Sequence, residues 1–149
     1  MFKKKEYLPI NEYGESWIIK SGISQGLPIF VRYNEYLKEA IGHRAYPYQL
    51  GIAVPLNDPN DQGLPSDSEA KVLFKIEDNI AKSLQDEAQL VMTITTNGMR
   101  EFVLYAQNWT PEAYEELVKA IGIKFPTHEL QFMIQKDTKW STFKTYTSS

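Results

Sequence analysis

Glu77 is the carboxylate whose surroundings most suggest chemistry. It lies in a segment of helical periodicity, at the edge of the apolar stripe and close to Phe74. With a nearby Arg32 or a tyrosine it could act as a general acid or base, which would suit a small hydrolase or isomerase. It could instead be held by Arg32 or by a backbone amide. We expect the structural partnership, because no second catalytic group can be named, so Glu77 and Arg32 are the only catalytic candidates.

The segment Arg100-Glu-Phe-Val-Leu-Tyr105 suggests a different chemistry, because it partly resembles the central strand of RNA recognition motifs. Phe102 would stack on bases beside Gly51 and Ala53, but a second aromatic residue is missing. The formal net charge of −3 also disfavours nucleic acid as a partner. Single-stranded RNA binding is therefore the third hypothesis. The alternative is that Phe102 covers the neighbouring glycine or is itself covered by the N-terminal hairpin.

Two further groups resemble metal sites, and we expect neither to bind a metal. His43 and His128 have no histidine four residues away, so we interpret them as surface or loop histidines. One loop has five residues near calcium-loop positions, but it contains two prolines and follows a strand rather than a helix. We interpret it as a turn-rich connection that ends in a helix cap, and we expect no metal and no cofactor. The five positions are Asp58, Asn60, Gln62, Gly63 and Glu69.

The composition is that of one ordinary globular domain. The chain has 149 residues, of which 42% are hydrophobic. It contains no cysteine, which excludes disulfides, thiolate nucleophiles and cysteine-based zinc sites. No apolar run is long enough to cross a bilayer, so we expect a cytoplasmic protein without a membrane partner.

The order of the hydrophobic patterns predicts an α+β fold. It corresponds to a ferredoxin-like split βαβ sandwich, in which an antiparallel sheet carries two helices on one face. An N-terminal β-hairpin and a short helix precede this core. We expect a single domain over 1–149, with the hairpin and short helix in 1–46, the core in 47–140 and a tail in 141–149 that frays. The core strands are predicted over 48–56, 89–96, 100–107 and 129–136, with helices after the first and the third.

Specific signals mark the helix ends and one turn. Ser66 and Glu69 have the spacing of a capping box at the start of the first helix. The second helix is predicted to begin at Thr110 and to stop at Gly122. The dipeptide Asn97-Gly98 is typical of a type I′ hairpin turn.

This turn also predicts the faces of the sheet. It would place Met92 opposite Val103 and Leu90 opposite Tyr105, on the face that meets the helices. The reverse face would be open and would serve as the binding surface. Its predicted binding residues are Arg100, Phe102, Thr93, Gln49 and Met133.

A series of motifs resembles an uncharacterised bacterial family, domain of unknown function 695, in order and spacing. In the family's tail pattern, Asp-Pro-x-Trp followed by Tyr, Thr138 replaces the proline and Phe143 stands in place of the tyrosine. The resemblance implies a ferredoxin-like domain without established catalytic residues. Some members are fused to a domain similar to regulator of ribonuclease activity B, which suggests a role in protein binding or RNA metabolism. The motifs are Trp17, the strand of Arg32, Tyr46-Pro47 with Leu50-Gly-Ile-Ala-Val54, Gly63-Leu64-Pro65, Ile76-Glu77-Asp78, Gly98-Met-Arg-Glu-Phe-Val-Leu-Tyr105 and Asp137-Thr-Lys-Trp140.

The preferred hypothesis is a non-enzymatic module that binds a protein or peptide. The missing catalytic set and the family fusions motivate it, and the open sheet face or an edge strand would supply the contact.

Overall fold

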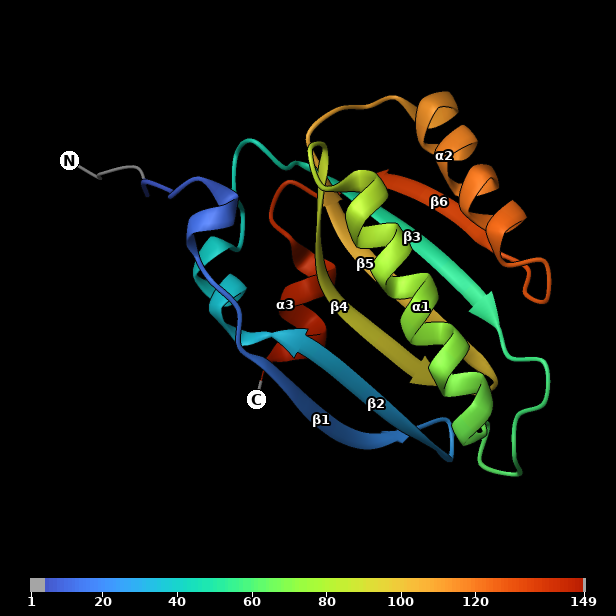
Figure 1. The fold of residues 1–149 in the computed structure, drawn as a ribbon. Coiled ribbons are helices and arrows are strands. Elements are labelled where there is room, and N and C mark those ends of the chain that lie inside the picture. Colours follow the sequence, from blue (N-terminus) through green and yellow to red (C-terminus); the bar gives the residue numbers. More distant parts are fainter. Residues whose placement is uncertain (1–4, 149) are drawn as a thin grey trace.

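The computed structural model describes residues 5–148, and its centre is a six-stranded antiparallel sheet (Figure 1). The ends of the predicted domain, 1–4 and 149, lie outside the described residues. The strands are β1 (Trp17–Ser24), β2 (Leu27–Asn34), β3 (Tyr48–Pro55), β4 (Ala88–Thr96), β5 (Met99–Ala106) and β6 (Gln131–Lys136). They lie in the order β1-β2-β4-β5-β3-β6, so β1 and β6 form the two edges.

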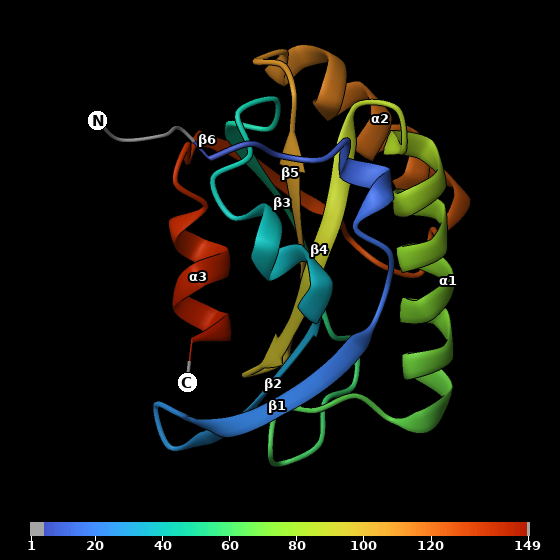
Figure 2. The same cartoon turned by 90° about the vertical axis from the view of Figure 1, so that its left-hand side faces the viewer.

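Helices lie on both faces of the sheet (Figure 2). The helices α1 (Asp67–Leu84) and α2 (Pro111–Lys124) cover one face. On the other lie the 3-10 helix η2 (Glu35–Ala40) and the helix α3 (Ser141–Thr147), while the 3-10 helix η1 (Ile10–Glu12) precedes β1. The predicted α+β class is confirmed, although α2 continues past Gly122. No helix within residues 5–148 is both long and apolar enough to span a bilayer.

Two tight turns fix the hairpins. Asn97 and Gly98 have φ angles of 50° and 75°, which confirms the predicted turn between β4 and β5. Gln25 and Gly26, with φ angles of 52° and 79°, form the corresponding turn between β1 and β2. Both turns suit the right-handed twist of their strands.

A β-bulge in β4 changes which side chains meet the helices. The register shifts between Leu90 and Met92, so that Leu90 pairs with Leu104 and not with Tyr105. Leu90 then packs beneath α1 and α2, whereas Met92 packs on the opposite face. The prediction that these two residues share a face is wrong, because the extra residue of the bulge, Val91, interrupts the alternation.

The sheet separates two hydrophobic cores. Phe102 is 0% exposed and packs in the core beneath α1 and α2 together with Ile52. Val103 and Tyr105, which belong to the same strand, are buried in the core on the other face. The prediction of an open sheet face around Phe102 is therefore wrong. Both faces are covered, which agrees with the uninterrupted apolar run in β5.

The second core is closed by Trp140 and by the segment after it, which the sequence predicts to fray. The ring of Trp140 stacks on that of Tyr105 at a centroid distance of 4.1 Å, and its indole N–H donates to the carbonyl of Tyr46 at 2.9 Å. The Asp137 carboxylate accepts from the Tyr105 hydroxyl and from the amide of Ser141, both at 2.8 Å. The prediction of a frayed tail is wrong, because these contacts fix the start of α3 to the sheet.

Candidate functional site

The two catalytic candidates form an ion pair between β2 and α1. The Arg32 guanidinium donates from Nη1 to Oε1 of Glu77 at 2.8 Å and from Nη2 to Oε2 at 3.1 Å. The ring of Trp17 lies against the same guanidinium, with 4.5 Å between its centroid and the guanidinium carbon. The structure thus contains the predicted contact between Arg32 and Glu77. Both carboxylate oxygens of Glu77 are engaged by a cation, which leaves this group poorly suited to accept a proton from a substrate.

The register of the sheet and the helical repeat bring this pair together. Arg32 pairs across the sheet with Thr93, which in turn pairs with the core residue Phe102, so all three side chains are on the face beneath α1. Glu77 lies on α1 four residues after Leu73 and is buried. Its carboxylate therefore points toward the sheet, where Arg32 is the cation within reach.

Arg100 lies near this pair and has no ion pair among residues 5–148. Its side chain is 9% exposed, and its buried Nε has no hydrogen-bond partner in the described chain. The guanidinium carbons of Arg32 and Arg100 are 5.8 and 5.9 Å from the ring centroid of Phe74. Burial lowers the pKa of the Arg100 guanidinium, while the charge of Glu77 raises it and that of Arg32 lowers it. We call Trp17, Arg32, Phe74, Glu77 and Arg100 the arginine cluster.

Three of the predicted binding residues lie on the face beneath the helices. Arg100, Phe102 and Thr93 are all buried. Phe102 pairs with Ile52 and not with the glycine of β3, so its ring points into the core. Base stacking on Phe102 is incompatible with this position. The RNA-binding hypothesis that depends on that ring is therefore wrong.

The other two predicted binding residues lie on the opposite face. Gln49 is buried, and its side-chain oxygen accepts from the Thr142 hydroxyl at 2.9 Å. Met133 is exposed, and its Cγ lies 3.0 Å from where a Cβ on Gly51 would be. The glycine is thus covered by Met133, the role that one alternative gives to Phe102. The five residues do not form a single surface.

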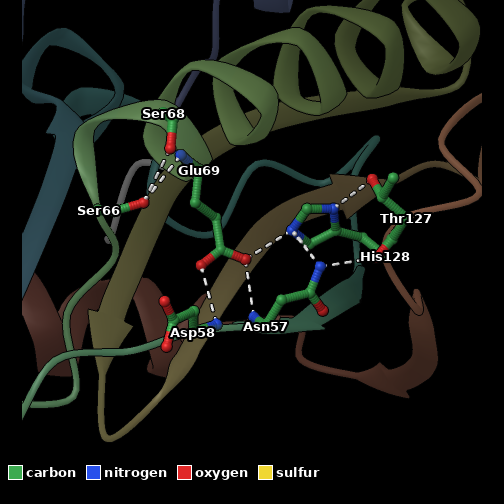
Figure 3. A network of polar contacts seen from close by, with 7 residues as sticks. All are labelled: Asn57, Asp58, Ser66, Ser68, Glu69, Thr127 and His128. Atoms are coloured by element: carbon green, nitrogen blue, oxygen red, sulfur yellow. Dashed lines mark hydrogen bonds and ion pairs between the residues drawn. The ribbon is translucent and has the colours of Figure 1, made fainter.

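A second polar network connects the start of α1 to the loop before β6 (Figure 3). Oε2 of Glu69 lies 2.6 Å from Nε2 of His128 and accepts from the Asn57 amide at 2.7 Å. The Thr127 hydroxyl lies 2.9 Å from Nδ1 of the same ring. The hydroxyl of Ser66 accepts from the Glu69 amide at 3.2 Å, which confirms the predicted helix cap. His128 lies in a loop, which is one of the two predicted alternatives, but it is buried and not at the surface.

This network contains a carboxylate, a histidine and a hydroxyl, as a catalytic triad does, but their arrangement differs from that of a triad. Burial alone would raise the pKa of Glu69, but the Asn57 amide, the His128 ring and the Asp58 amide outweigh it and lower that pKa. The short contact to Glu69 favours a proton on Nε2 of His128, which leaves Nδ1 to accept from Thr127. In a serine-type triad the carboxylate binds Nδ1 instead. We conclude that Glu69 holds two loops against α1. Within residues 5–148, no group of three or more acidic or histidine residues is placed to bind a metal.

His43 belongs to a different part of the molecule, where it also lies in a loop and is buried. Its Nε2 lies 2.8 Å from the carbonyl oxygen of Leu8. Its ring packs against Tyr7 at a centroid distance of 4.9 Å and against Tyr46 at 5.2 Å. These contacts attach the N-terminal segment to the loop after η2.

The outer edge of β1 is the third candidate. Among residues 5–148, no strand pairs with β1 on the side away from β2. Ile18, Ile19 and Ile23 are 36%, 68% and 74% exposed, and they occupy both faces of this strand. A hollow of about 160 Å³ lies beside it on the α3 side, lined in part by Gly22 and Tyr146.

A comparison with known protein families gives a match over most of the chain. A family model described as DUF695, a family of unknown function, matches residues 15–147. The chain belongs to this family. The DUF695 match confirms the resemblance seen in the motifs and spans every element from β1 to α3. No curated protein matches the chain, and neither does any solved structure.

The structure brings together residues from separate DUF695-like motifs. Trp17, Arg32, Glu77 and Arg100 come from four such motifs and meet in the arginine cluster. Trp140, from the last motif, closes the second core. Sequence reasoning predicted the contact between Arg32 and Glu77 but not the addition of Trp17 and Arg100, because their proximity depends on the register of β2, β4 and β5.

Proposed function

We propose that this chain is a non-enzymatic module that binds an extended segment of a protein partner along the edge of β1. The observation that carries the proposal is the unpaired outer edge of an eight-residue strand that exposes isoleucines on both faces. An extended peptide can add to such an edge by main-chain hydrogen bonds. The arginine cluster and the Glu69 network supply no free catalytic base, which favours binding over catalysis.

The side chains of β1 lack the usual protection of an exposed edge. Edge strands in soluble proteins commonly carry several charges, a proline or a bulge, which prevent unwanted pairing. Between Trp17 and Ser24 the only charged residue is Lys20, and there is no proline. The register with β2 runs from Trp17 to Ser24 without a shift. The strand is therefore suited to receive a neighbour.

The opposite edge of the sheet is a weaker candidate. β6 has six residues, and its apolar side chains Phe132 and Ile134 pack against the core beneath α2. Its last residue is Lys136, and Gln131 and Gln135 are exposed. A partner on β6 would meet mostly polar side chains, whereas one on β1 would cover isoleucines. Burial of apolar surface therefore favours β1.

The hairpin turn determines which backbone groups of β1 are available. In a two-residue hairpin the closing pair, here Ser24 and Leu27, is the hydrogen-bonded kind, and such pairs alternate along the ladder. The amides of Ile19, Ser21 and Ile23 are then directed away from β2. A proline at Ser21 would remove an outward N–H while leaving the β1 to β2 ladder intact.

A peptide selection tests the proposal. A phage-displayed library of random peptides would be selected on the immobilised chain, and the best peptide titrated calorimetrically into the wild type, Ser21→Ala and Ser21→Pro. We expect equal affinity for the first two. Ser21→Pro should bind roughly tenfold or more weakly, because it loses a backbone hydrogen bond and sterically blocks the edge.

Two results would count against this function. A peptide that binds Ser21→Pro as tightly as Ser21→Ala would show that binding occurs elsewhere. A dimer of the free chain in sedimentation velocity, abolished by Ser21→Pro, would show that a second copy occupies the edge instead of a partner.

We also propose that the core of the chain has the ferredoxin-like fold. The core strands follow the order β4-β5-β3-β6, with α1 after β3 and α2 after β5, which supports the ferredoxin-like split βαβ plan. Location in the cytoplasm also stays a prediction, and cell fractionation with an antibody against the chain would test it.

A further inference from the structure

Arg100 is a buried cation without an ion-pair partner among residues 5–148. A guanidinium carries five N–H donors and is costly to bury without hydrogen bonds and a counter-ion. Nε of Arg100 is buried without a partner, and no ion pair of this residue occurs within residues 5–148. The carboxylate whose negative charge acts on Arg100 is that of Glu77, and both of its oxygens already bind Arg32. One positive charge is therefore left over in the arginine cluster.

Two hydroxyl groups stand on the strand between the arginines. β4 lies between β2 and β5, and it places Thr93 beside Arg32 and Thr95 beside Arg100 on the face beneath α1. Both threonines are buried. Hydroxyl donors beside an unpaired guanidinium form a typical oxyanion environment.

We infer that Arg100, Thr93 and Thr95 form a binding site for the carboxylate group of an organic acid or an acidic side chain. This site lies on β4 and β5 and is separate from the β1 edge.

The charge and shape of the cluster favour a carboxylate over a phosphate. A single negative charge would neutralise the unmatched Arg100, whereas a phosphate dianion would leave an excess next to Glu77. A planar carboxylate also fits the planar fork of a guanidinium. Phe74, whose ring centroid is 5.9 Å from the Arg100 guanidinium carbon, would contact an apolar body attached to the carboxylate.

Phe74 also indicates the side from which a ligand would reach Arg100. Its side chain is 48% exposed although it is next to two guanidinium groups, and the Arg32 side chain is 25% exposed. The cluster therefore lies at the margin of the layer between α1 and the sheet, not at its centre.

The small number of arginines allows a direct test by NMR. The chain contains only Arg32, Arg44 and Arg100, so the arginine Nε–Hε region of a ¹⁵N spectrum holds three signals. Single Arg→Lys variants assign them. Acetate, hexanoate and inorganic phosphate would be titrated separately at constant ionic strength. We expect a saturable shift of the Arg100 signal with both carboxylates, at lower concentration for hexanoate, and no saturable shift of the Arg44 signal.

Matched variants at Thr95 separate binding from folding. Thr95→Val removes the hydroxyl and keeps the shape, and it should weaken hexanoate binding severalfold, while Thr95→Ser should retain it. The backbone amide spectrum shows that each variant is folded. Absence of a saturable Arg100 shift with hexanoate in the folded wild type would overturn the site. Tighter binding of phosphate than of hexanoate would overturn its assignment to carboxylates.

Discussion

The Arg32 guanidinium binds both carboxylate oxygens of Glu77 across 45 residues of sequence, at 2.8 and 3.1 Å. This contact fastens the β1–β2 hairpin to α1, because Arg32 belongs to β2 and no other ion pair within residues 5–148 joins these two elements. The hairpin that carries the proposed binding edge is joined to the sheet by the β2–β4 ladder, and this ion pair and the Trp17 ring on the same guanidinium join it to α1.

Replacing Glu77 by Gln should therefore destabilise the fold. We expect the free energy of unfolding to fall by about 1 to 3 kcal/mol, since Arg32 would lose its charged partner. Urea denaturation measures this change. Asp78→Asn, at an exposed position on the same helix, is the matched control and should change stability by less than about 0.5 kcal/mol. Unchanged stability of Glu77→Gln together with a lost biological function would favour a chemical role for Glu77.

The network around Glu69 predicts a specific dependence on pH. The pKa of Glu69 is lowered in the folded chain, so its contribution to stability is complete above the unfolded pKa and is lost as the pH falls through the folded value. Glu69→Gln should be less stable than the wild type at pH 7 by about 1 to 3 kcal/mol, and this difference should shrink in acid. Urea denaturation at several pH values measures it. Glu129→Gln, an exposed control, should show no such trend. A difference that grows in acid would contradict the assignment.

The C-terminal helix should be part of the cooperative fold. Phe143 is fully buried in the second core, so Phe143→Ala should lower the free energy of unfolding by about 3 to 5 kcal/mol. Lys144→Ala, at the adjacent exposed position, should change it by less than about 0.5 kcal/mol. Thermal unfolding followed by circular dichroism compares the two. Equal, small effects would mean that α3 is detached in solution.

Gly22 offers a way to block partner binding without harming the fold. A Cβ added there would meet only Cγ2 of Ile29, at 3.7 Å, which is an ordinary contact. Gly22→Val would partly fill the hollow beside β1, so we expect affinity for a selected peptide to drop about tenfold or more with the melting temperature unchanged. Gly22→Ala should have a smaller effect. Calorimetric titration that finds full affinity for the valine variant would show that the hollow takes no side chain of the partner.

Local signals in the sequence predicted most elements but not their burial. Asn97-Gly98 determines its turn through positive φ angles, and Ser66 caps α1 through its own neighbours, so both follow from adjacent residues. The faces of the sheet do not. The bulge at Val91 reverses the alternation of β4, and Phe102 lies in a strand whose apolar side chains serve two cores. Alternation alone cannot assign faces in such a strand, although its continuous apolar run was a signal that both are covered.

Long-range contacts account for the remaining differences between the predictions from the sequence and the structure. Glu69 meets His128 across 59 residues, and no local pattern around His128 indicates such a partner. Trp140 is followed by a polar segment that resembles a frayed tail, yet Asp137 caps its helix and Phe143 anchors it. The pairing of Arg32 with Glu77 was one of the expected partnerships, because Glu77 lies at the edge of the apolar stripe of its helix. The proximity of Arg100 depends on the strand order.

Amide hydrogen exchange of the chain with and without a selected peptide tests the central claim most directly. Pairing along β1 predicts slower exchange on binding at Ile19, Ser21 and Ile23, whose amides are directed away from β2, and no change in β6. Protection confined to β6 or to α2, with β1 unchanged, would contradict it.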